Sequence, residues 1–136
     1  MRGQRILLAL LGIAFLVSVV HYTDNYVNYA DFPHGGSVPE PSRALVGSSW
    51  FLFTAFGVAG LVLFMRRRVV PAAICLTAYS VSGLVGLGHY TVPGATGMVW
   101  WRQAHVVVDI VLGVLVLAFA LRLVTTRTTE AATAGP

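Results

Sequence analysis

The chain has 136 residues, of which 57% are hydrophobic and only 10% charged, with a formal net charge of +4 and a mean hydropathy of +0.78. Soluble domains usually carry about 25% charged residues, so this composition excludes an ordinary soluble domain and predicts a membrane protein with one domain. The nine basic residues are all arginines whose placement follows membrane topology, so we expect no nucleic-acid partner. Because Cys75 is the only cysteine, the chain can form neither an internal disulfide nor a cysteine-based metal cage.

Four apolar runs are each close to the ~20 residues that a membrane-spanning helix requires. We expect spans at about residues 6–31, 44–65, 69–90 and 99–124. Together they predict an all-α fold, a four-transmembrane-helix bundle that occupies residues 1–124. Residues 125–136, which are rich in threonine and alanine, are expected to form a disordered tail.

The first span begins with an apolar run over residues 6–20 and continues into a polar stretch. Helical spacing places His21, Asp24, Asn25 and Asn28 on one face of that stretch. Pro33, which has no N–H, is expected to stop this amphipathic extension, so that it ends near residue 31. A cleaved signal peptide is the alternative for the apolar run, but no small-residue cleavage pattern follows it, so we expect it to be retained.

The placement of arginine predicts the orientation of the spans. With the N-terminus inside, seven arginines fall on inner segments and two, Arg43 and Arg102, on outer segments. This distribution follows the positive-inside rule. Because the number of spans is even, both termini are expected on the cytoplasmic side of the plasma membrane, with the loops near residues 31–43 and 91–97 outside.

Polar side chains also lie in the outer halves of the third and fourth spans. In the third span, Ser82 and His89 share one face. In the fourth, Arg102, His105 and Asp109 lie within about 60° of one another around the helix axis. An isolated carboxylate beneath the interface is costly, so Asp109 should face the bundle and have a partner. That partner could be Arg102 or His105 on its own helix.

Three spans are therefore expected to bring histidines and aspartates to one level near the outer face. Such side chains suit Zn, Fe or Cu, and three histidines with one or two aspartates can leave an open position that activates water. The predicted metal ligands are His21, Asp24, His89, His105 and Asp109. The predicted cofactor- or substrate-binding residues are Asn25, Asn28, Ser82 and Arg102.

Three functions fit this pattern. The first is a metal-dependent integral membrane enzyme acting on a lipid or isoprenoid, although the fixed positive charge of Arg102 disfavours a metal nearby. The second is a subunit with a b-type haem between His21 and His89, which is less favoured because haem ligands usually lie deeper. The third is a non-catalytic transporter-like or accessory protein with a structural polar cluster. A homodimer is compatible with each of them, because four short spans offer few side chains to line a large cavity.

Overall fold

The computed structural model describes residues 2–35 and 39–133, with side chains for residues 3–35 and 39–126. The described residues form four α-helices, namely α1 (Arg2–Val27), α2 (Arg43–Met65), α3 (Val69–Leu84) and α4 (Trp100–Thr133). They also form three short 3₁₀-helices, η1 (Tyr29–Asp31), η2 (Val85–Thr91) and η3 (Ala95–Gly97). The predicted all-helical architecture is confirmed.

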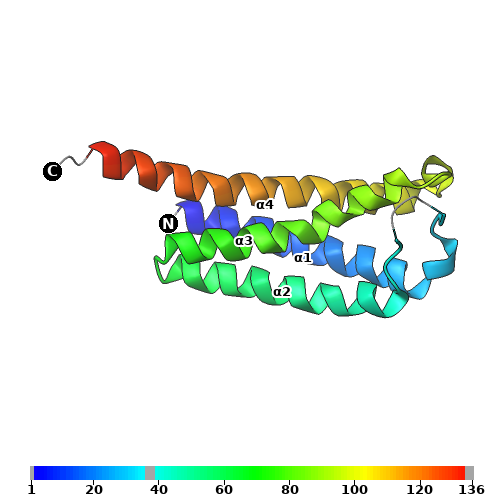
Figure 1. Ribbon diagram of the computed structural model, residues 1–136. Helices are drawn as coiled ribbons and strands as arrows, with labels where there is room; N and C mark the ends of the chain where they lie inside the picture. The colour runs from blue at the N-terminus through cyan, green and yellow to red at the C-terminus, as the bar shows by residue number, and fades with distance from the viewer. Residues whose placement is uncertain (1, 36–38, 134–136) are drawn as a thin grey trace.

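The four α-helices form an up-and-down bundle in which α1 packs on α2 and α4, and α3 packs on the same two helices (Figure 1). The start of α1, the turn between α2 and α3 and the end of α4 lie at one end of the bundle. The opposite end, termed the loop end, carries the α1–α2 and α3–α4 connections. Among the described residues, four helical segments are long and apolar enough to cross a membrane: Gly3–Val27, Arg43–Met65, Val69–Thr91 and Trp100–Thr126. The predicted number of spans is therefore confirmed by the length and apolar composition of the helices.

Glycines allow neighbouring helices to approach closely. A Cβ added at Gly60 of α2 would lie 2.9 Å from side-chain atoms of Leu76 on α3. Between α3 and α4 the approach is closer still, because a Cβ at Gly83 would overlap the backbone carbonyl oxygen of Asp109. Small residues at such crossings let the backbones pack directly. The close contact at Gly83 therefore determines where Asp109 of α4 lies relative to α3.

The apolar core has two parts. The larger part fills the middle of the bundle and the end opposite the loops, with Leu7, Leu11, Ala14, Ala73, Leu76, Tyr79, Leu112, Val116 and Ala120 buried. The smaller part lies beneath the loops and contains Phe32, Ala95, Met98 and Val106. Along the chain, His21 falls between Ala14 of the larger part and Phe32 of the smaller, and Asp109 falls between Val106 of the smaller part and Leu112 of the larger. The polar groups thus lie at a break in the apolar core.

Two helix ends differ from the sequence-based expectation. The α-helix of the first span ends at Val27, and the chain tightens into η1 instead of remaining α-helical to residue 31. There the backbone N–H of Asp31 donates to the carbonyl of Asn28, which is the i to i+3 pattern of a 3₁₀-helix. The third span changes from α-helix to η2 after Leu84. Two glycines of low helix propensity, Gly86 and Gly88, lie in that segment.

The end of α4 also differs from expectation. The helix continues to Thr133, so residues 125–133 are helical where a disordered tail was expected, and residues 134–136 lie outside the described residues. The Thr126 hydroxyl donates back to the carbonyl of Arg122, and the Thr125 hydroxyl donates to the same carbonyl. Each of these threonine hydroxyls thus has an acceptor within its own helix.

Candidate functional site

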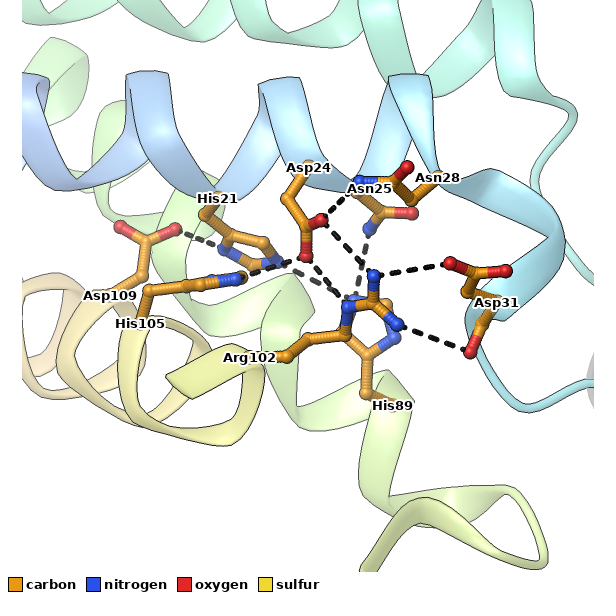
Figure 2. A network of polar contacts seen from close by, with 9 residues as sticks. All are labelled: His21, Asp24, Asn25, Asn28, Asp31, His89, Arg102, His105 and Asp109. Atoms are coloured by element: carbon orange, nitrogen blue, oxygen red, sulfur yellow. Dashed lines mark hydrogen bonds and ion pairs between the residues drawn. The ribbon is translucent and has the colours of Figure 1, made fainter. Parts of the chain in front are cut away.

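A buried cluster of polar side chains occupies the bundle near the loop end, as Figure 2 shows. Four elements contribute to it: α1 with His21, Asp24 and Asn25, η1 with Asp31 and the preceding Asn28, η2 with His89, and α4 with Arg102, His105 and Asp109. The predicted gathering of histidines and aspartates from the first, third and fourth spans is confirmed. The cluster divides into two hydrogen-bonded groups.

The first group, termed the His21 group, links Asp109, His21, His89 and Asn25. His21 Nδ1 lies 2.7 Å from Asp109 Oδ2, and both residues are almost fully buried, with exposed fractions of 2% and 3%. On the other side of the ring, His21 Nε2 lies 3.5 Å from His89 Nε2. The Asn25 amide nitrogen lies 3.0 Å from the same His89 nitrogen. His21 therefore bridges a buried carboxylate and a second imidazole.

The local sequence of η2 explains how two histidines from different elements meet. Residues i and i+3 align along one side of a 3₁₀-helix, so Gly86 lies directly below His89. A Cβ at Gly86 would lie 3.5 Å from Cε1 of His21, so the glycine leaves space for the His21 ring to pass. An α-helix would not align these two positions in the same way.

The second group, termed the Asp24 group, is centred on a buried ion pair. Arg102 Nε donates to Asp24 Oδ2 at 2.8 Å, and Arg102 Nη2 donates to Asp24 Oδ1 at 3.2 Å. The carboxylate also accepts from the Asn28 amide at 2.7 Å and from His105 Nε2 at 3.1 Å. Arg102 reaches farther to Asp31, with a 3.4 Å bond to its carbonyl and a 3.5 Å contact with its carboxylate. Four donors thus occupy the Asp24 carboxylate.

His105 lies where the two groups meet. Its ring centroid is 5.4 Å from that of His21, while its Nε2 atom faces Asp24. Its Nδ1 atom is buried and makes no hydrogen bond within the described part of the chain. His105 therefore belongs to the Asp24 group by its hydrogen bond and touches the His21 group by its ring.

The partner of Asp109 differs from the alternative considered from the sequence. Asp109 does not pair with Arg102 or His105 on its own helix, because those two side chains bond to Asp24 of α1. It pairs instead with His21 across the α1–α4 interface. The two carboxylates of the cluster consequently have separate partners, and each joins α1 to α4.

The predicted site residues fall as follows. Of the predicted metal ligands, His21, His89 and Asp109 lie in the His21 group, while Asp24 and His105 lie in the Asp24 group. Of the predicted cofactor-binding residues, Asn25 contacts His89, whereas Asn28 and Arg102 contact Asp24. Ser82 is apart from both groups, since its hydroxyl and its carbonyl contact the Tyr22 hydroxyl. Their roles in binding a metal or cofactor stay predictions.

A cavity of about 490 Å³ lies against the His21 group, between α1, α2 and η2 and beneath the α1–α2 loop. Its lining comprises His21, Tyr22, Asn25, Tyr29, Phe32, Pro33, His34, Pro39, Glu40, Pro41, Leu45, Val46, Ser49, Phe53, Val85, Gly86, Gly88, His89, Thr91 and Val92. Most of this lining is apolar or aromatic, and the His21 group forms a polar wall on one side. The volume falls within the range of about 300–1,000 Å³ that is usual for small-molecule sites.

The sequence analysis missed the residues that cover this cavity. Phe32 is the clearest case, because its ring lies 4.9 Å from the His89 ring and 4.7 Å from the Arg102 guanidinium carbon, and only 4% of it is exposed. A bulky aromatic residue within an otherwise polar, proline-containing connection was the signal that could have identified it. His34 also lines the cavity, where its Nδ1 lies 2.6 Å from Glu40.

The two groups do not form a ready metal cage. Among the side chains described, those of residues 3–35 and 39–126, no set of three or more His, Cys, Asp or Glu is arranged to hold a metal ion. The Asp24 carboxylate faces Arg102, so it is directed at a cation of the chain itself.

Comparisons with protein-family models, with curated proteins and with solved structures find no match to this chain. A functional assignment therefore depends on the geometry of the site.

Proposed function

We propose that this protein binds a lipid or isoprenoid in the 490 Å³ cavity and acts on its polar head group. The observation that supports the proposal is the position of His21, Asn25 and His89 on one wall of an otherwise apolar cavity. An amphipathic ligand fits such a lining, because its hydrocarbon part would cover the apolar walls while its head group meets the imidazole and amide groups.

The rim of the cavity supports access from the membrane. Leu45 of α2 and Val85 of η2 line the cavity and are 56% and 50% exposed. Exposed apolar side chains of a four-span bundle would face lipid, so a ligand would enter laterally between α2 and η2. With the orientation predicted from the arginines, the cavity opens near the outer face of the plasma membrane.

The Asp109–His21 pair supports an enzyme over a passive carrier. A carboxylate bonded to one imidazole nitrogen orients the ring and leaves the other nitrogen directed at a reacting group. Here His21 lines the cavity, and its other nitrogen, Nε2, faces His89. The buried carboxylate lies behind it at 2.7 Å. A pair that only held the helices together would not need to lie at the wall of a cavity.

An accessory, non-catalytic role is the second candidate, and the Asp24 group favours it. The four donors on the Asp24 carboxylate make this group self-contained, as expected of a structural link between α1 and α4. The b-type haem alternative has less support. Axial ligands lie on opposite faces of the porphyrin, and the 3.5 Å separation of the two facing Nε2 atoms leaves no space for a macrocycle between them.

Binding can be tested by native mass spectrometry of delipidated protein in detergent, with geranylgeraniol and phosphatidylglycerol as probes. We expect one of them to bind with one molecule per chain. Val85→Trp places a large ring in the cavity and should abolish binding. Val81→Trp is the matched control, because Val81 is an exposed residue one helical turn earlier that does not line the cavity. Absence of binding by the unaltered protein, or equal binding by both variants, would overturn the proposal.

A further inference from the structure

We propose that His21 Nε2 and His89 Nε2 together bind one divalent first-row transition metal ion, such as Zn²⁺, at the polar wall of the cavity. Asn25 would supply a third ligand, and the remaining position would open to the cavity. This inference rests on the proposed function, because the ion would lie where the head group of the lipid or isoprenoid is expected.

The contacts of the His21 group bring two imidazole nitrogens, His21 Nε2 and His89 Nε2, close together. A carboxylate accepts hydrogen bonds and donates none, so His21 Nδ1, at 2.7 Å from Asp109, carries a hydrogen. In a neutral imidazole the other nitrogen, Nε2, then holds a lone pair. His89 Nε2 lies 3.0 Å from the Asn25 amide nitrogen, which can donate to its single lone pair. When the Asn25 amide turns away, that lone pair is free, and a cation between the two imidazole nitrogens would be attracted by both.

The separation of the two nitrogens fits a metal ion better than a shared proton. A nitrogen donor in a hydrogen bond typically lies about 2.9–3.0 Å from its acceptor. Two metal–nitrogen bonds of about 2.0–2.1 Å at a tetrahedral angle place their nitrogens about 3.3–3.4 Å apart. The separation of 3.5 Å between His21 Nε2 and His89 Nε2 is close to the second value.

The charge of the buried cluster also favours a cation. With neutral histidines, Asp24 and Asp109 contribute two negative charges and Arg102 one positive charge, which leaves a net charge of −1 on residues that are at most 7% exposed. Uncompensated charge is costly within a membrane. Arg102 was expected to disfavour a metal ion, but its guanidinium is neutralised by two bonds to the Asp24 carboxylate. The Asp109 carboxylate remains to balance an ion at His21.

The donor set is smaller than that of a closed structural site and resembles an open one. Two histidines alone hold an ion weakly, so a third ligand is needed. A half-turn of the Asn25 amide would exchange its nitrogen, which lies 3.0 Å from His89 Nε2, for its oxygen, and the oxygen could then bind the ion. Asp109 would act behind His21, in the arrangement of carboxylate, histidine and metal that orients many ligands. His105 would not be a ligand, because its Nε2 faces Asp24.

Metal binding can be measured on metal-stripped, full-length protein by equilibrium dialysis against Zn²⁺ and by the visible d–d bands of bound Co²⁺. We expect an equimolar amount of Zn²⁺ and a Co²⁺ spectrum with nitrogen ligands. Both signals should be lost in His89→Gln and in His21→Gln. They should persist in His105→Gln, which keeps a donor near Asp24. Asp109→Asn should weaken binding by about 10- to 100-fold, the usual effect of altering a residue behind a ligand.

Two results would overturn the metal site: no stoichiometric metal in the unaltered protein, or unchanged metal binding in His89→Gln. His89 lies on a short 3₁₀-helix at the end of the bundle, so this variant tests the site even if His21→Gln does not fold. Binding of geranylgeraniol and phosphatidylglycerol is measured in parallel on metal-free and on Zn²⁺-treated protein. Lipid binding by a protein that takes up no metal would reject the metal site alone, whereas absence of lipid binding both with and without Zn²⁺ would reject the proposed function.

Discussion

Asp24 and Arg102 form a two-point ion pair between α1 and α4, although 78 residues separate them in the chain. Their side chains are 5% and 8% exposed, so the pair is shielded from water. The planar guanidinium matches the two carboxylate oxygens, a geometry that a lysine cannot reproduce. This contact also holds η1 in place, because Arg102 reaches Asp31 as well.

Removing one partner of this ion pair should destabilise the bundle strongly. We expect Arg102→Gln to lower the free energy of unfolding by about 3–5 kcal/mol, because the Asp24 carboxylate would remain buried without its cation. Thermal unfolding in detergent measures the change. The double variant Asp24→Asn, Arg102→Gln serves as the control and should lose less than the sum of the single variants. Additive losses would show that the two side chains act independently.

Asp109 should tolerate an amide better than an apolar side chain. Asp109→Asn keeps an acceptor for the His21 Nδ1–H, whereas Asp109→Ala leaves that buried donor unsatisfied at a cost of about 1–3 kcal/mol. We therefore expect the alanine variant to unfold at the lower temperature. Equal unfolding temperatures would mean that the hydrogen bond to His21 contributes nothing to stability.

Gly83→Ala should disrupt the contact between α3 and α4. The added methyl group would overlap the Asp109 backbone carbonyl, which cannot move away as a side chain can. Overpacking of this kind typically costs about 1–3 kcal/mol. Gly12→Ala on α1 is the matched control, because a Cβ at Gly12 has no atom within 4 Å. That variant should be neutral or stabilising, by up to about 1 kcal/mol, since alanine favours helix more than glycine does.

Labelling of single cysteines tests the orientation. In a Cys75→Ser background, Thr96→Cys lies in the α3–α4 connection and Arg66→Cys lies in the turn between α2 and α3. A membrane-impermeant thiol reagent should label Thr96→Cys in intact cells and Arg66→Cys only after permeabilisation. The reverse pattern would place the cavity on the cytoplasmic side and contradict the orientation inferred from the arginines.

The spans and the polar face of α1 could be predicted from the sequence because both depend on local patterns. Long apolar runs identify membrane spans, and the spacing of His21, Asp24 and Asn25 identifies one helix face without knowledge of any partner. The structure retains that face in the site: His21 and Asn25 contact His89, while Asp24 contacts Arg102.

The pairing of the polar groups could not be predicted, because it depends on how the helices pack. Helical spacing places Asp109 near Arg102 and His105 along α4, and only the α1–α4 contact shows that His21 is its partner. The division of the predicted ligand set follows from the same packing. The cover that Phe32 provides was not foreseeable either, since it depends on the path of the α1–α2 loop over η2.

The helical type of η2 has a further consequence for the two facing histidines. Three residues complete a full turn in a 3₁₀-helix but only about 300° in an α-helix, so rewinding η2 would rotate His89 by about 60° relative to Gly86. Such a rotation would carry the His89 ring out of register with His21. The 3₁₀ conformation of the seven residues of η2 therefore determines whether the imidazole rings of His21 and His89 meet.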